Sequence, residues 1–331
     1  MTGPTIDIHS HYYPQRYLEL IAEEGAPFGA SCNLHAPGGP VIKVGMQFAG
    51  PLGSKFVDLD ERVVAMDAQG VAVQALSLTQ PMIYWAGEAL AQKLTEAFND
   101  ALVAAHEAHP ERFVGFAILP MHHPDLAIQE LKRLAGAPGI KGAYMATRVL
   151  DKELSDPGFF PVYEQLEALG LPVFLHPIEV IGMERLAADY FLHNLLGNPF
   201  DTAIAAAHLV FSGVLDRFPN LEFCLPHAGG ALPFLIGRMQ HGWSVRPELK
   251  HMERGPRDYL GRFYYDTISH DPKALSFLID EVGADRVMMG SDYCFDMGYE
   301  RPVEVVTTHP GLSEDGKAAI VDGNARRLLG L

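Results

Sequence analysis

The 331-residue sequence predicts an α/β chain folded as a (β/α)₈ barrel, or TIM barrel. Short apolar runs alternate with longer segments of helical periodicity, which is the pattern of parallel strands joined by helices. The chain length and an apolar fraction of 48% suit one large core, and few other single-domain folds need so many residues. We therefore expect residues 1–331 to form one domain.

Eight apolar runs rich in β-branched residues are predicted to form the barrel strands. Eight is the number that a closed barrel of this class requires. The predicted strands are Thr5–His9, Val71–Leu78, Phe113–Ile118, Ile140–Ala146, Pro172–His176, Glu222–Leu225, Phe263–Asp266 and Val287–Gly290.

Helical spacing of apolar residues marks the segments between these strands, and several begin with proline, which the first turn of a helix tolerates. The predicted helices are Gly87–His109, Pro124–Leu134, Pro157–Leu169, Pro199–Gly213, Leu232–Arg238, Pro272–Val282 and Gly316–Leu329. Residues 27–56, after the first strand, are rich in glycine and proline and poor in periodicity. We expect them to form an insertion or lid over the barrel mouth, because long ordered loops are usually functional.

The charge balance and the N-terminal sequence restrict the possible partners. Lys and Arg total 25 against 41 Asp and Glu, a net charge of −16, which argues against a nucleic-acid or anionic-membrane partner. The N-terminus lacks a basic flank and a long apolar stretch, so we expect no secretory signal and no membrane span. Three separated cysteines without a CxxC pair exclude a disulfide framework. The sequence predicts a cytoplasmic enzyme with a small-molecule substrate.

Histidines lie at the ends of three predicted strands. His9 and His11 are separated by one residue, and alternate residues of a strand point the same way, so both imidazoles can share one ion. His176 ends another strand, and His227 follows a third, before the glycine pair Gly229–Gly230, which would let the backbone approach a ligand closely. A single such histidine can be structural, but three strand ends are harder to explain in that way.

A carboxylate follows the last predicted strand, where a Gly290–Ser291 turn precedes Asp292. The carboxyl ends of barrel strands converge on one face, so Asp292 should meet the four histidines despite their separation in sequence. Imidazole and carboxylate ligands together suit zinc or another first-row divalent ion. The sequence therefore predicts one divalent ion, with Zn²⁺ preferred and Mn²⁺ as the alternative.

Four motifs, IDIHSH near the start, LHP, LPHAGG and GSDY near the end, resemble those of the amidohydrolase superfamily. They are most similar to the branch typified by 2-amino-3-carboxymuconate-6-semialdehyde decarboxylase, and the resemblance spans nearly the whole chain. It implies a (β/α)₈ barrel with one metal ion bound by His9, His11, His176 and Asp292. It also implies that His227 lies beside the ion as the acid–base catalyst.

The resemblance further implies a reaction class. The branch contains nonoxidative decarboxylases of aromatic or muconate-type acids, together with hydratases and carbon–carbon hydrolases. We expect a metal-dependent decarboxylase, a carbon–carbon lyase, in which Asp292 or His227 gives a proton to the substrate carbon. The alternative is a hydrolase or hydratase that acts on a ring-cleavage product or amide through metal-bound hydroxide, and no residue decides between the two.

Three further expectations come from the same resemblance. Arg238 matches a position that reaches the neighbouring subunit's site in a dimer, which implies a homodimer and a substrate-binding role; a surface arginine is the alternative. Residues 46–51 contain no arginine where a branch member holds a substrate carboxylate, so we expect a different acid. Lys141 lies near the beginning of the fourth strand, too far from the site to bridge two metals, which favours a single ion. The sequence leaves four other histidines without a role: His122, His123, His193 and His270.

Overall fold

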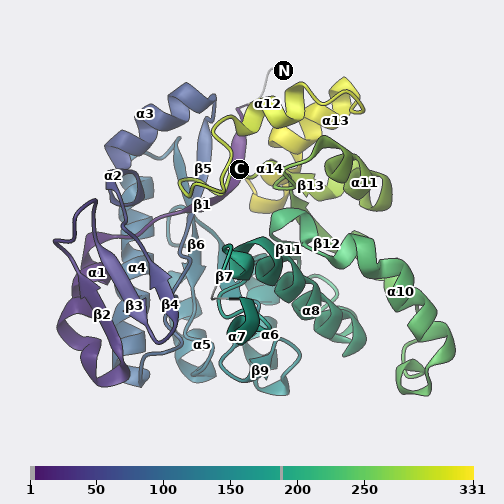
Figure 1. Cartoon of the computed structure of the whole chain (residues 1–331), viewed down its shortest axis with the longest axis horizontal. Helices are drawn as coiled ribbons and strands as arrows, with labels where there is room; N and C mark the ends of the chain where they lie inside the picture. The colour runs from purple at the N-terminus through teal and green to yellow at the C-terminus, as the bar shows by residue number, and fades with distance from the viewer. Residues whose placement is uncertain (1–3, 187–188) are drawn as a thin grey trace.

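The computed structural model describes residues 4–186 and 189–331. Eight parallel strands form one sheet in the order β1-β5-β6-β7-β10-β11-β12-β13, and Figure 1 shows them in the middle of the molecule with helices around them. The predicted (β/α)₈ barrel is confirmed. The strands are β1 (Ile6–His11), β5 (Val73–Ser77), β6 (Phe113–Ile118), β7 (Ile140–Ala146), β10 (Val173–His176), β11 (Phe223–Leu225), β12 (Phe263–Asp266) and β13 (Val287–Met288).

The barrel closes between β1 and the segment that follows β13. The backbone N–H of Asp292 donates to the carbonyl of His9 over 2.8 Å, and that of His11 donates to the carbonyl of Tyr293 over 2.7 Å. Every residue of β1 is buried, as expected for a parallel strand with both faces covered. Closure therefore places Asp292 directly beside the two histidines of β1.

The predicted helices are present, with two main differences at an end and one inside a predicted segment. The segment predicted from Pro157 begins as a 3₁₀ turn, the helix predicted to end at Arg238 continues to Val245, and residues 319–323 form a π-helical turn. The continuation past Gly242 shows that packing outweighs the low helix propensity of glycine. The helices are α1 (Gln15–Glu24), α2 (Ser54–Val57), α3 (Leu59–Gln69), α4 (Glu88–Ala108), α5 (Pro124–Leu134), α6 (Phe160–Leu169), α7 (Met183–Leu186), α8 (Asn198–Phe211), α9 (Val214–Arg217), α10 (Leu232–Val245), α11 (Pro272–Val282), α12 (Pro302–Thr307), α13 (Glu314–Ala318) and α14 (Asn324–Leu329).

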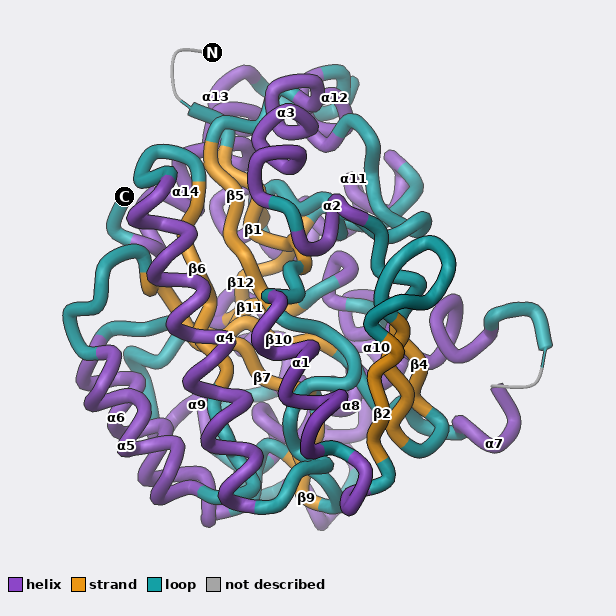
Figure 2. The backbone as a smooth tube through the Cα atoms, turned by 90° about the vertical axis from the view of Figure 1, so that its left-hand side faces the viewer, coloured by secondary structure: helices purple, strands orange, loops and turns teal. Residues whose placement is uncertain are grey.

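Residues 27–56 form an insertion, as expected, but they are not without regular structure. They contain a small antiparallel sheet of β2 (Ala30–Asn33), β3 (Val41–Val44) and β4 (Gln47–Ala49), which Figures 1 and 2 place outside the barrel. Strands of three or four residues are too short to give a readable alternation. The side-chain amide of Gln47 donates to Glu179, in the segment after β10, over 2.9 Å, so the insertion contacts the mouth side of the barrel.

A hairpin of β8 (Arg148–Val149) and β9 (Lys152–Glu153) follows β7. Within the described residues, no helix combines the length and the apolar character needed to cross a bilayer. The three cysteines are unpaired, in agreement with the expected lack of a disulfide framework.

Candidate metal centre

Five side chains from four strand ends meet at the mouth of the barrel. His9, His176, His227 and Asp292 each offer one ligand atom, and these four atoms lie within 4.8 Å of one another. His11 lies in the same cluster, because its Nε2 is 3.0 Å from Asp292 Oδ1. Its ring centroid is 5.0 Å from those of His9 and His176. The structure therefore brings together every residue that the sequence placed at the metal site.

The arrangement of His9 and His11 depends on a bulge in β1. The pairing of β1 with β5 shifts by one residue between Asp7 and Ser10. The two imidazoles still lie in one cluster, with their ring planes at 85° to each other. The carboxylate of Asp7 accepts the backbone N–H of His9 over 3.1 Å and so holds the chain at the irregular position.

His9 is oriented by Asp266, the last residue of β12. Its Nδ1 donates to the Asp266 carboxylate over 2.7 Å, which leaves the lone pair of Nε2 free. Burial alone would lower the pKa of His9, but the bond to Asp266 and the nearby charge of Asp292 outweigh it and raise that pKa. Within the described residues, His9 Nε2 is buried and has no hydrogen-bond partner. A buried nitrogen lone pair that faces other potential metal-ligand atoms fits a metal ion.

His176 and His11 are held in their neutral forms. His176 Nδ1 donates to the carbonyl of Pro177 over 2.8 Å, so its Nε2 presents a lone pair to the cluster. Burial, followed by the charges of His11 and His9, lowers the pKa of His176 well below its ordinary value. Burial also lowers the pKa of His11 to about 4, against the opposing effect of Asp292. Neutral imidazole is the form that binds metals.

Asp292 is an ionised carboxylate in a strained backbone position, with φ of 58°. Burial by itself raises its pKa, but the hydrogen bond to His11 and the nearby imidazoles of His227 and His9 outweigh burial and hold the pKa well below its ordinary value. A Cβ atom at Gly290 would lie 3.0 Å from the Cβ atoms of His9 and Asp266. Glycine at this position therefore permits close packing of the β13 end against the two strands that support the site.

His227 begins a turn whose backbone is held by the carboxylate of Asp266. The backbone N–H groups of His227 and Ala228 donate to the Asp266 carboxylate over 2.9 and 2.8 Å. His227 Nε2 lies 3.8 Å from Asp292 Oδ2, and the imidazole is 15% exposed. One carboxylate, Asp266, thus positions both His9 and His227.

The glycine pair after His227 serves the turn itself. Gly229 and Gly230 have φ of 78° and 59°, which favours glycine. A Cβ atom at Gly229 would lie 2.7 Å from the ring of Tyr265, and one at Gly230 would collide with the carbonyl of Pro199. We expected these glycines to let a ligand approach the backbone; Gly230 lines the cavity beside His227, and a side chain on either glycine would collide with protein atoms.

His227 and Asp292 open into a cavity of about 740 Å³. Phe234 and Phe277 contribute aromatic wall, and Asn198, His270 and Lys273 contribute polar groups. Burial, followed by the charge of His227, lowers the pKa of His270. The cavity gives His270 a place at the site that the sequence alone did not assign.

The other three histidines that the sequence left without a role lie away from this cavity. His122 donates from Nε2 to the carbonyl of Ala86 over 3.0 Å, and the ring of His123 lies beside it with centroids 4.4 Å apart. His193 packs against Phe191, with ring centroids 4.6 Å apart. Within the described part of the chain, none of the three lines the cavity that holds His227.

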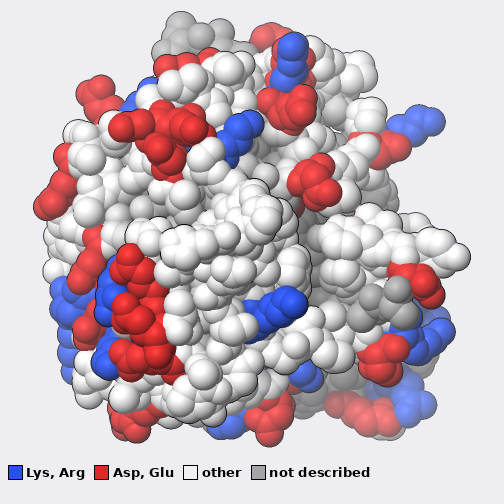
Figure 3. Space-filling view, turned by 60° about the vertical axis from the view of Figure 1, so that its left-hand side comes forward, with Lys and Arg blue, Asp and Glu red and all other residues white. Residues whose placement is uncertain are grey.

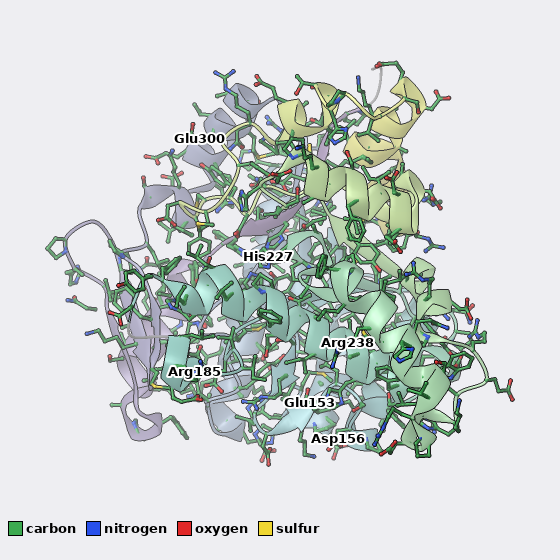
Figure 4. The ribbon with its side chains drawn as sticks, turned by 45° about the vertical axis from the view of Figure 1, so that its right-hand side comes forward. Glu153, Asp156, Arg185, His227, Arg238 and Glu300 are labelled. Atoms are coloured by element: carbon green, nitrogen blue, oxygen red, sulfur yellow. The ribbon has the colours of Figure 1, made fainter. Side chains whose placement is uncertain are left out.

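Arg238 does not line the cavity of its own chain. It is exposed on α10 and lines a separate hollow of about 350 Å³ with Phe200 and Met239. Figure 4 labels Arg238 on the helix and His227 near the barrel centre. Its expected role in a partner's site stays a prediction. Lys141 donates to the carbonyl of Gly330, near the chain's C-terminus and away from the cluster.

Asp266 is the main residue of the site that the sequence reasoning missed. Its strand was predicted with the correct end, but no role was given to the carboxylate. The signal was available, because Asp266 is an acidic residue at the carboxyl end of a strand and the same rule selected Asp292. What the sequence could not show was that Asp266 lies beneath His9 and His227 and contacts both.

Comparisons with known proteins agree with this geometry. The family model described as Amidohydrolase matches residues 6–331. The chain is 35% identical over 329 residues to 2-amino-3-carboxymuconate-6-semialdehyde decarboxylase of Dictyostelium discoideum, covering 98% of this chain and 91% of the relative. Among solved structures it is similar to IDCase of Metarhizium anisopliae (TM-score 0.88, 26% identity, 99% and 97% of the two chains covered). It is also similar to 5-carboxyvanillate decarboxylase of Sphingomonas paucimobilis (TM-score 0.86, 25% identity, 99% of each chain covered).

Proposed function

This chain belongs to the Amidohydrolase family, and we propose on that basis that it is a metal-dependent nonoxidative decarboxylase of an aromatic or muconate-type carboxylic acid. The resemblance predicted from the four motifs is confirmed. The observation that carries the proposal is the cluster at the barrel mouth, whose four ligand atoms lie within 4.8 Å of one another. The Dictyostelium relative is named for a muconate-type acid and the Sphingomonas enzyme for an aromatic one.

The cofactor is one divalent metal ion, and we propose Zn²⁺, with Mn²⁺ as the alternative. His9, His11, His176 and Asp292 would hold it, with His227 as a competing ligand for the position of His11. Three imidazoles and a carboxylate are suitable ligands for both ions. When bound, the ion supplies a Lewis acid that withdraws electrons from the substrate.

His227 is the better of the two proposed proton donors. Loss of carbon dioxide leaves an electron pair on the substrate carbon, and a proton must form the new C–H bond there. The pKa of Asp292 is lowered, mainly by the hydrogen bond to His11 and the nearby imidazoles, which favours its ionised form and makes it the poorer proton donor. His227 Nε2 lies 3.8 Å from Asp292 Oδ2 at the cavity wall, where this nitrogen can hold a proton and pass it to the substrate.

The cavity fits the proposed class of substrate. A volume of about 740 Å³ with apolar walls accepts one aromatic ring or an open-chain product of similar size. Asn198 and His270 both line this cavity, and an amide and an imidazole can form hydrogen bonds with the oxygen substituents of a substrate. Residues 46–51 contain no arginine, so we keep the proposal that the acid differs from the carboxymuconate semialdehyde.

A second copy of this chain is the proposed partner. Phe234 on α10 is 83% exposed and Tyr190, before α8, is 84% exposed, and a second copy of the chain would cover such apolar side chains. In such a homodimer, the exposed Arg238 on α10 would be the candidate to bind a substrate carboxylate in the partner's site. Sedimentation of the purified protein at micromolar concentration tests the assembly; a monomer would contradict it.

The remaining partner predictions rest on charge. On the face drawn in Figure 3, acidic side chains gather in clusters with lysines and arginines among them. Together with the net charge of −16, this supports the prediction that nucleic acid is not a partner. A cytoplasmic location stays the prediction made from the N-terminal sequence.

A substrate panel tests the proposed function. Metal-free protein, prepared with a chelator, should release no carbon dioxide from hydroxybenzoates and ring-cleavage acids, and addition of Zn²⁺ or Mn²⁺ should restore release. Because an ion contributes several kcal/mol of transition-state stabilisation, we expect a restoration of about a thousandfold or more. Release of an acid or amine without carbon dioxide would favour the hydrolase alternative.

A further inference from the structure

An arginine on a helix outside the barrel extends its side chain inward to the segments that carry the metal cluster. Arg62 belongs to α3, yet it is fully buried, with 0% exposure. Buried arginines are normally paired with a carboxylate. In the described residues Arg62 contacts no carboxylate directly, and its guanidinium donates to oxygens of the backbone and of one amide.

The acceptors of Arg62 lie on the segments that carry the metal cluster. Its Nη2 donates to the carbonyl of His11 and, over 2.8 Å, to that of Lys55. Its guanidinium also lies over the ring of Tyr293, 5.1 Å from the centroid, directly after Asp292 in the chain. Arg62 therefore contacts both sides of the seam where β1 meets the segment after β13.

The buried charge of Arg62 is balanced through an amide relay. Arg62 Nη1 donates to the side-chain oxygen of Gln74 over 3.0 Å, and the Gln74 amide nitrogen donates to Asp7 over 2.9 Å. Asp7, itself fully buried, accepts the backbone N–H of His9 over 3.1 Å and that of Ser291 over 3.0 Å. The relay thus ends on the residues adjacent to the cluster.

We propose that Arg62 is a positioning residue for the metal centre, which acts by fixing the backbone of His11 and the ring that follows Asp292. The inference rests on the proposed function, because it assumes that the cluster binds an ion. Arg62 has no contact with the cavity and no catalytic role. Its side chain holds two segments at the separation that the ligand atoms need, and lysine, with a single charged nitrogen, cannot reach the same acceptors.

The test measures metal affinity together with stability. Arg62→Lys and Arg62→Met should weaken Zn²⁺ binding by about 10- to 100-fold, the usual effect of losing a group that supports metal ligands, as measured by competition with a chromogenic chelator. The absorption spectrum of the Co²⁺-loaded variants should also change, because the ligand geometry changes. Arg262→Met is the matched control, since Arg262 also donates to two backbone carbonyls, those of Leu215 and Pro219, away from the cluster.

Each outcome decides the inference. The inference is supported if the Arg62 variants lose more Zn²⁺ affinity than Arg262→Met does, at a similar free energy of unfolding. It is overturned if the Arg62 variants bind Zn²⁺ as tightly as the wild type and their Co²⁺ spectrum is unchanged. If the Arg62 variants do not fold, Gln74→Met, which breaks the relay but keeps the contact of Arg62 with His11, should weaken Zn²⁺ binding by about 10-fold, and unchanged binding overturns the inference. Failure of the wild-type chain to bind any divalent ion would instead contradict the proposed function.

Discussion

The two ends of the barrel carry hollows of nearly equal size, about 740 Å³ at the mouth and about 730 Å³ at the amino-terminal ends of the strands. Their linings differ. The lower hollow contains charges that are already paired, such as Arg112 with Asp67 over 2.8 Å. At the mouth, ring nitrogens of His9 and His227 are buried without a partner in the described residues. Two neighbouring histidine rings, each with an unpartnered buried nitrogen, and not volume, distinguish the functional end.

The difference has an energetic meaning. A buried polar atom without a partner costs about 1–3 kcal/mol, so two such nitrogens on neighbouring rings indicate a place where a ligand satisfies them. In a barrel of this class the carboxyl ends of the strands support chemistry and the opposite ends support stability. Substitutions at the mouth should therefore change metal binding or turnover, whereas substitutions at the lower end should change stability alone.

The largest expected effect is a difference between variants of two histidines at the mouth, His11 and His227. His11→Ala removes a proposed ligand, so the purified protein should lose its ion and about a thousandfold or more in turnover. His227→Ala should keep the ion and lose about a hundredfold in turnover, the usual contribution of a general acid or base. Metal content by mass spectrometry and carbon dioxide release are measured on both variants.

The opposite pattern is also informative. His227 is one of the four residues whose ligand atoms lie within 4.8 Å of one another. Loss of the ion in His227→Ala and its retention in His11→Ala would make His227 a ligand and remove it from proton transfer. Unchanged turnover in His227→Ala would exclude it from both roles.

A smaller effect is expected at Asp266, the carboxylate that holds His9 and His227 in place. Asp266→Asn weakens the bond that raises the pKa of His9, and we expect metal affinity to fall by about 10- to 100-fold. Because the raised pKa favours the protonated form of His9 in the metal-free protein, metal binding must displace a proton from its ring. Affinity should therefore rise with pH until His9 has lost its proton.

Calorimetry in buffers of different ionisation enthalpy measures the proton released. The wild-type chain should release a proton from His9 as the ion binds, and the Asp266→Asn protein should release less, since the bond to Asp266 helps to raise the pKa of His9. His11, whose pKa is lowered to about 4, should release almost none. An Asp266→Asn protein that releases as many protons as the wild type would contradict the assigned role of Asp266.

The contrast between the two ends also explains what the sequence could predict. Strand ends that carry His9, His176 and Asp292 were readable, because each chemical group follows an apolar run and barrel topology brings those ends together. Asp266 and Arg62 were not assigned roles, since their importance lies in contacts made between distant segments. The small sheet of residues 30–49 was missed because its strands are too short to show periodicity.

The smallest expected effect is at the lower hollow. Arg112 donates from Nη2 to Asp67 over 2.8 Å, but Asp67 is well exposed, so the ion pair contributes at most about 1 kcal/mol. Arg112 Nε also donates to the carbonyl of Ala72 over 2.8 Å, which adds about 1 kcal/mol. Arg112→Gln should thus lower the free energy of unfolding by about 1–2 kcal/mol in denaturant titration, while metal content and turnover stay within about twofold of the wild type. A large loss of turnover with intact stability would show that the lower hollow contributes to function, and the distinction between the two ends would fail.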